Sequence, residues 1–162
     1  MSYTGNVTQG GPPDVRELAD VTITKVEVGD FGNNAYLLRC KRTGDGLLID
    51  AAAEADRLIE LIGDRPISAI VTTHRHQDHW MALEEVARRT GARTIAHPLD
   101  APHLPVQVAR TVEHGDRIAF GEAEVEVIHL RGHTPGSIAL RYDGGGTNQH
   151  IFTGDSLFPG GV

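Results

Sequence analysis

The sequence holds a single cysteine, few aromatic residues and fewer basic than acidic side chains. One thiol cannot form an internal disulfide, and the apolar segment around Cys40 predicts a small buried core residue. The net charge of −7 at pH 7 argues against nucleic acid as a partner, because phosphate binding needs a basic patch. No apolar run is long enough to span a bilayer, so no membrane partner is expected.

The first residues also lack the apolar core of a signal peptide, which predicts a cytoplasmic protein. Residues 1–18 are polar and contain Gly10-Gly11-Pro12-Pro13, a composition that predicts a flexible N-terminal arm. Residues 19–162 are then expected to form one domain. The hydrophobic content of 40% and charged content of 23% for the whole chain fit a globular protein with a sizeable core.

Apolar periodicity predicts many short strands and two helices. Strands are expected at residues 21–28, 35–40, 47–50, 67–72, 93–96, 118–120, 122–130, 138–142 and 150–153. Helices are expected at residues 54–62 and 81–90, and a short helical or turn segment at 98–104. Because helices separate several of the strands, this order predicts α/β or α+β layering.

A dense cluster of metal-binding side chains follows the strand predicted at residues 67–72. The run His74-Arg75-His76-Gln77-Asp78-His79 lies on a strand-to-helix loop. Residues two apart in an extended segment face the same side, so His74 and His76 can bind one ion. Asp78 and His79 are then left for a second ion, and such ligands suit zinc or iron. A histidine-rich surface loop is the alternative, but the strict spacing after an apolar strand favours metal.

The cluster resembles the signature of the metallo-β-lactamase fold superfamily, and three other motifs resemble that family in the same order. They are Leu47-Leu48-Ile49-Asp50, Gly132-His133-Thr134-Pro135-Gly136-Ser137 and Phe152-Thr153-Gly154-Asp155-Ser156-Leu157-Phe158. The resemblance implies an α/β fold, the αββα sandwich of that family. It also implies one metal site of His74, His76 and His133, a second of Asp78 and His79, and a bridging Asp155. Asp50 and Thr72 are expected to support these ligands without binding metal.

The chain departs from the family after Asp155, where the last metal-ligand histidine of the family has no counterpart. We therefore expect the second half of the sandwich to be incomplete, with its C-terminal strands and helix missing. Such an ending exposes an unpaired sheet edge and apolar surface. Three explanations stay open: a truncated longer enzyme, a fragment completed by a partner chain, or two copies that complete each other as a homo-oligomer. The mid-loop character of Pro159-Gly160-Gly161 favours the first.

The resemblance implies a metal-dependent hydrolase, in which water made acidic by two cations attacks an ester, thioester or amide carbonyl of a small-molecule substrate. Zinc is expected, with iron or manganese as other candidates, and Asp78 is expected to orient the water and accept its proton. The residues Asp155 and His79 resemble the glyoxalase II branch, although the glutathione-contacting region of that branch has no counterpart here. Two alternatives are a mononuclear iron sulfur dioxygenase that uses His76, His133 and Asp155, and an inactive metal-binding fragment.

Overall fold

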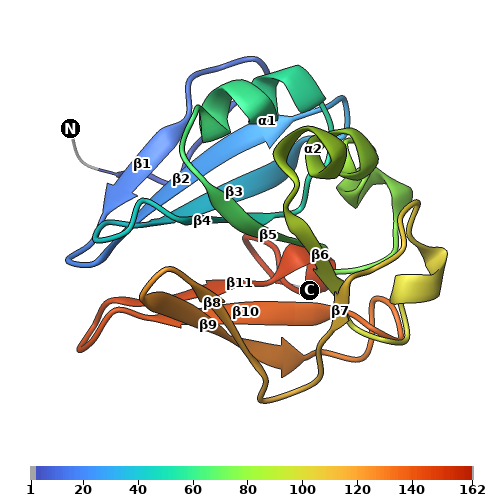
Figure 1. Cartoon of the computed structure of the whole chain (residues 1–162). Helices are drawn as coiled ribbons and strands as arrows, with labels where there is room; N and C mark the ends of the chain where they lie inside the picture. Colours follow the sequence, from blue (N-terminus) through green and yellow to red (C-terminus); the bar gives the residue numbers. More distant parts are fainter. Residues whose placement is uncertain (1–2, 162) are drawn as a thin grey trace.

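The computed structural model describes residues 3–161, in which two β-sheets pack face to face and two helices cover the outside of the larger sheet (Figure 1). The larger sheet has the strand order β1-β2-β3-β4-β5-β6-β7, with bounds Asp14–Glu17, Val21–Val28, Asn33–Cys40, Gly46–Ile49, Ile67–Val71, Arg93–Ala96 and Arg110–Thr111. The smaller sheet has the order β11-β10-β9-β8, with bounds Gln149–Phe152, Ile138–Asp143, Ala123–His129 and Arg117–Phe120. Helices α1 and α2 span Ala55–Ile62 and Leu83–Thr90.

Two apolar cores lie on the two faces of the larger sheet, and alternation along its strands supplies both. In β4, Leu47 and Ile49 point into the core between the sheets, whereas Leu48 points into the core beneath the helices. The same alternation divides β2, whose Ile23 joins the first core and Val26 the second. A strand that is buried on both faces reads as a continuous apolar run, which is why Leu47-Leu48-Ile49 contains no polar residue.

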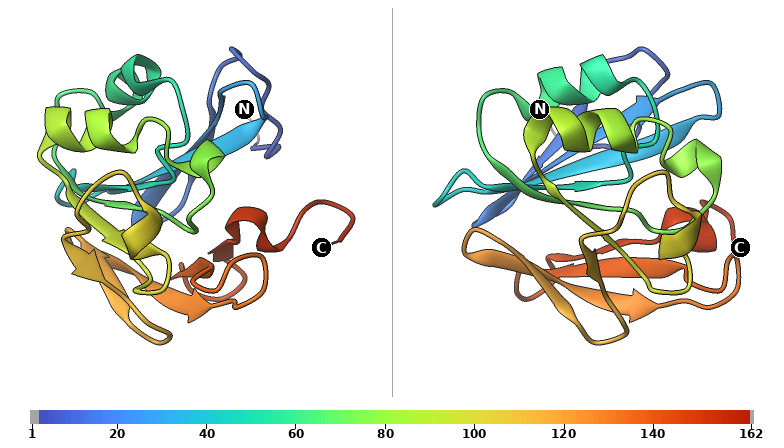
Figure 2. Two further views of the ribbon diagram at one scale, coloured as in Figure 1. Left: turned by 90° about the vertical axis from the view of Figure 1, so that its right-hand side faces the viewer. Right: turned by 45° about the vertical axis from the view of Figure 1, so that its right-hand side comes forward.

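Strand pairing in the larger sheet changes from antiparallel to parallel at β4, and this change brings several loops to one end of the sandwich, which we call the functional end. Strands β1 to β4 pair antiparallel, and β4 to β7 pair parallel. The carboxyl ends of β4, β5 and β6 therefore meet at one end of the sandwich, and the loops that follow them lie side by side (Figure 2). Ligands of open α/β sheets bind at such an edge.

The expected α/β sandwich agrees with this arrangement. Within residues 3–161 one helical layer covers the larger sheet, and no α-helix covers the outer face of the smaller one (Figure 2). That outer face carries ion pairs instead, between Arg117 and Glu124 and between Arg141 and Glu126. Large apolar side chains are exposed at the last strand and beyond it, in Ile151, Leu157 and Phe158, and also elsewhere, most of all in Phe31. Cys40 is a buried core residue, as expected.

The predicted flexible arm at residues 1–18 is wrong over its last part. Residues 14–17 form β1, which pairs with β2 from Asp14 opposite Lys25 to Glu17 opposite Thr22. A side-chain carboxylate also orders the chain before the strand, because Asp14 Oδ2 accepts hydrogen bonds from the backbone N–H groups of Thr4 and Gly5. The polar composition concealed an edge strand, and residues 1 and 2 lie outside the described part. No described helix is long and apolar enough to cross a membrane.

Candidate metal centre

Both sheets contribute loops to the functional end of the sandwich. The loop after β5 carries His74, His76 and a short 3-10 helix, Gln77–His79, before α2 begins. From the smaller sheet, the β9–β10 loop carries His133, and the 3-10 helix Gly154–Ser156 after β11 carries Asp155. Residues that are 81 positions apart in sequence, such as His74 and Asp155, thereby face each other, with 3.6 Å between His74 Nε2 and Asp155 Oδ2.

Three imidazoles form the first donor group. His74, His76 and His133 each offer a nitrogen, and these atoms all lie within 4.8 Å of one another. The shortest separation, 2.9 Å, joins His76 Nδ1 and His133 Nε2. His74 is buried, whereas His76 and His133 are exposed, so the group has one closed and one open side. This is the set that the sequence predicts for one ion.

A second donor group contains His74, His79 and Asp155. Asp155 Oδ1 lies 3.1 Å from His79 Nε2, and Asp155 Oδ2 lies 3.4 Å from His133 Nε2. One carboxylate therefore points an oxygen at each group, which is the placement needed by a ligand shared between two cations.

Asp78, which was predicted to bind the second ion together with His79, lies beside these groups and belongs to neither of them. Its Oδ2 is 3.8 Å from His79 Nε2 and accepts a hydrogen bond of 2.9 Å from Asn33 Nδ2. Burial acts to raise the pKa of Asp78, but the Asn33 hydrogen bond and the neighbouring His79 hold it below its usual value. Asn33 is the first residue of β3. Its role was not predicted from the sequence because its local sequence pattern is the same as that of an ordinary turn asparagine.

Asp50 holds the buried histidines through a hydrogen-bonded network. Its Oδ2 accepts from His79 Nδ1 at 2.8 Å and from Thr73 Oγ1 at 2.8 Å, and its Oδ1 accepts from the Thr73 N–H at 2.7 Å. Because the Thr73 hydroxyl donates to Asp50, it is free to accept from His74 Nδ1, 3.0 Å away. Both Nδ1 atoms are thus occupied, and both Nε2 atoms are left to face the site.

The residue hydrogen-bonded to this network is therefore Thr73, the neighbour of Thr72, for which the supporting role was predicted. The backbone N–H of Thr72 continues the sheet by donating to Ile95 O, and no described hydrogen bond joins its side chain to the site. Gly154 explains how Asp155 comes so close to this network. It has φ +54, and a Cβ there would lie 2.6 Å from Thr73 Oγ1.

The donor atoms fit a divalent metal by their own chemistry. His74 Nε2 and His79 Nε2 are buried and have no hydrogen-bond partner among the described residues. Buried polar nitrogens without a partner are costly, and a cation bound by their lone pairs removes that cost. Imidazole with carboxylate is a donor set that suits zinc, iron and manganese to different degrees.

The two buried histidines should make opposite contributions to the pH dependence of the stability of the metal-free chain. Burial and the neighbouring His79 lower the pKa of His74 from 6.5 to about 4, so stability falls as the pH drops from 6.5 toward 4. Burial also acts to lower the pKa of His79, but the hydrogen bond to Asp50 and nearby carboxylates raise it to about 9. The contribution of His79 to stability is therefore lost as the pH rises from 6.5 toward 9. Each limb should cost roughly 2 to 3 kcal/mol.

Urea unfolding between pH 4 and 9 in the presence of a chelator measures this profile. Replacing Asp50 by asparagine should flatten the alkaline limb, because the interaction that raises the pKa of His79 is then lost. If the parent chain and Asp50→Asn had the same slope between pH 6.5 and 9, the assignment of charge to His79 would be contradicted.

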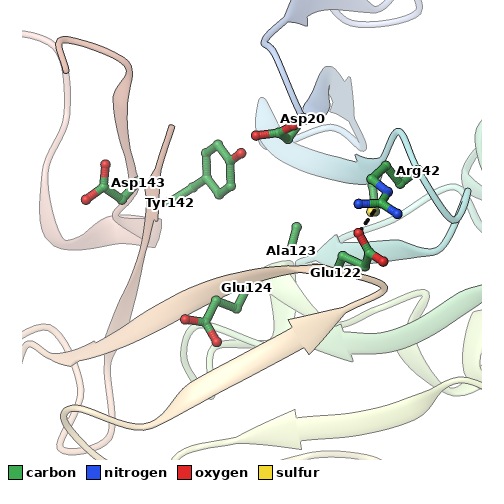
Figure 3. Close-up of a pocket in the computed structure, with 8 residues that line it drawn as sticks. Asp20, Arg42, Glu122, Ala123, Glu124, Tyr142 and Asp143 are labelled. Carbon is green, nitrogen blue, oxygen red and sulfur yellow. Dashed lines mark ion pairs between the residues drawn. The ribbon is translucent and has the colours of Figure 1, made fainter. Parts of the chain in front are cut away.

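Two cavities adjoin Asp155 and give the donor groups access to solvent. One has a volume of 440 Å³ and is lined by Leu130, Arg131, Gly132, His133, Asp155 and Ser156. The other has a volume of 280 Å³, and its lining includes Asp50, His79 and Phe158. A third cavity, of 340 Å³, is lined by Tyr142, Asp20 and the Arg42–Glu122 ion pair, and none of its lining residues belongs to a donor group (Figure 3). A substrate for the donor groups must therefore use the cavities at Asp155.

A sequence model of the metallo-beta-lactamase superfamily matches residues 28–162, which include every donor described above. The chain belongs to the metallo-β-lactamase superfamily. Hydroxyacylglutathione hydrolase of Rhodospirillum rubrum is 40% identical over 131 residues, which cover 80% of this chain and 49% of the relative. The chain spans about half the length of the curated relatives it matches.

Solved structures agree with the fold. TTHA1623 in a di-iron-bound form superposes with a TM-score of 0.71 at 33% identity, covering 85% of this chain and 74% of that one. ETHE1 from Myxococcus xanthus superposes with a TM-score of 0.71 at 26% identity, covering 85% of this chain and 58% of that one. These matches confirm the predicted superfamily and its α/β sandwich.

Proposed function

We propose that this chain forms the catalytic part of a binuclear metallo-hydrolase that cleaves a carbonyl bond of a small molecule. The observation that carries the proposal is the position of Asp155, whose two carboxylate oxygens face different donor groups. Two cations so held would lower the pKa of a shared water and polarise a carbonyl. His74, His76 and His133 would hold one cation, and His79 with Asp155 the other.

Other residues of the chain would orient the ligands and the attacking water. Asp50 and Thr73 keep His74 and His79 in the tautomer that presents Nε2. Asp78, fixed by Asn33 and ionised at neutral pH, would accept a hydrogen bond from the attacking water and orient it. Because its pKa is lowered, Asp78 stays ionised. It is therefore suited to accept a hydrogen bond from the attacking water and poorly suited to hold the proton that this water loses.

The substrate class that we propose first is a thioester. The relatives named hydroxyacylglutathione hydrolase support it, because the matched residues are 40% identical in one of them and 37% identical in another. The 440 Å³ cavity beside His133 and Asp155 has room for the acyl or thiol portion of such a molecule. Zinc is the cation that we propose, and the di-iron form of TTHA1623 makes iron the first alternative to test.

Metal analysis combined with turnover tests this proposal. The purified chain should bind two zinc ions and hydrolyse a hydroxyacylglutathione or a simple thioester faster than an ester or an amide. One bound iron with uptake of dioxygen would instead support a sulfur dioxygenase. Failure to bind zinc or iron at millimolar concentration, in a chain that is folded by circular dichroism, would support an inactive fragment.

A further inference from the structure

A buried carboxylate outside the donor groups joins the two loops that carry the first metal site. Asp100 lies between β6 and the 3-10 helix Ala101–His103, and its side chain is 1% exposed. It has no ion-pair partner among the described residues, and no motif in the sequence singled it out. Burying a carboxylate without a neighbouring cation costs free energy, so the hydrogen bonds that it accepts must offset that cost.

All the side-chain hydrogen bonds of Asp100 go to these two loops. Oδ2 accepts a hydrogen bond of 3.0 Å from the backbone N–H of Arg75, the residue between His74 and His76 in the sequence. Oδ2 also accepts from Thr134 Oγ1 at 2.6 Å, and Oδ1 accepts from the Gly136 N–H at 2.9 Å. The donors therefore come from the histidine cluster on one side and from the loop of His133 on the other.

The absence of a side chain at position 136 makes this arrangement possible. A Cβ on Gly136 would lie 2.7 Å from Asp100 Cγ and Oδ1, too close for any ordinary contact. The φ of Gly136 is not in the left-handed region, so the glycine is needed here for close approach and not for its backbone freedom.

We propose that Asp100 is a positioning residue that sets the separation of His76 and His133. Those two imidazoles come from different sheets, and their ring nitrogens are 2.9 Å apart. The side chains are exposed, so surrounding packing does little to hold them. Asp100 fixes the backbone next to each one and so presents both nitrogens to one cation. The consequence for metal binding rests on the function proposed above, whereas the pairing of the loops does not.

Asp100→Asn and Asp45→Asn form a matched pair of variants to test this role. Asp45 also joins separate parts of the chain, because its Oδ2 accepts from the Gly121 N–H at 2.9 Å and from Ser68 Oγ. It lies at the β3–β4 turn, away from the donor groups. Asparagine at position 100 offers only one acceptor oxygen, so it leaves at least one of the loop donors unpaired. Zinc affinity should fall 10- to 100-fold in Asp100→Asn and stay within about twofold of the parent in Asp45→Asn.

A metal-free measurement separates this inference from the proposed function. Nuclear Overhauser effects between the His76 and His133 rings should be present in the parent chain and in Asp45→Asn, and lost in Asp100→Asn. This comparison stands even if the parent chain binds no zinc. An Asp100→Asn chain that is folded and keeps both the ring contacts and the parent zinc affinity would overturn the proposal.

Thr134 provides the test if Asp100→Asn does not fold. Thr134→Ser keeps the hydroxyl that donates to Asp100, and Thr134→Val removes it with little change in shape. Zinc affinity should fall about tenfold in Thr134→Val and return to the parent value in Thr134→Ser. Equal zinc affinities and equal ring contacts in the two variants would overturn the role of Asp100.

Discussion

Asparagine at position 155 should slow hydrolysis by about a thousandfold or more, equivalent to about 4 kcal/mol of transition-state stabilisation. The carboxylate of Asp155 faces the Nε2 atoms of His74, His79 and His133 at 3.1 to 3.6 Å, so its two oxygens face both donor groups. An amide keeps the shape but loses the charge and one acceptor. Zinc content should drop from two ions to one or none, measured by mass spectrometry of the metal after dialysis.

The fold should tolerate this change, which makes the result interpretable. Asp155 makes no described hydrogen bond to the backbone, so the circular dichroism spectrum of the metal-free chain should stay close to that of the parent. Asp20→Asn, on the rim of the distant cavity, is the control that removes a carboxylate without touching the site. If Asp155→Asn kept two zinc ions and full turnover, a shared carboxylate would have no part in the chemistry.

Local patterns were sufficient to predict most of the strands and the histidine loop. Alternation made β2 visible, and the unbroken run of Leu47, Leu48 and Ile49 marked a strand buried on both faces. Strand β1 was missed because an edge strand half in water has little apolar pattern. Strand β7 was missed because it has two residues, too few for any period to register.

The residues that support the donors were harder to predict because their role depends on contacts between distant segments. Asn33 meets Asp78 across 45 positions, and Asp100 meets Thr134 across 34. Each is an ordinary polar residue in its own neighbourhood. Thr73 differs from the predicted Thr72 by one position, yet neighbouring side chains on an extended chain point to opposite sides, so that single step selects the wrong face.

Asp50→Asn should destabilise the metal-free chain by about 3 kcal/mol at pH 7. The carboxylate is 3% exposed and accepts three hydrogen bonds, two from Thr73 and one from His79. Asparagine retains one acceptor oxygen and tolerates the left-handed backbone at this position, where φ is +60. The loss of stability therefore comes from weaker hydrogen bonds once the charged carboxylate is removed, and not from backbone strain. Urea unfolding measures the stability, and proton NMR should show the pKa of His79 falling below its parent value of about 9.

Two further substitutions separate the backbone contribution of Asp50 from that of its side chain. Asp50→Gly and Asp50→Ala both remove every acceptor, but alanine must also adopt the left-handed conformation, which costs about 1 kcal/mol more. Asp56→Asn is the matched control, since Asp56 is 94% exposed and pairs only with Arg89, so its loss should cost at most about 1 kcal/mol. Equal stabilities for Asp50→Asn and Asp56→Asn would mean that the network around His79 contributes nothing to the fold. A large loss at position 50 alone would show that the donor nitrogens are held in place before any metal binds.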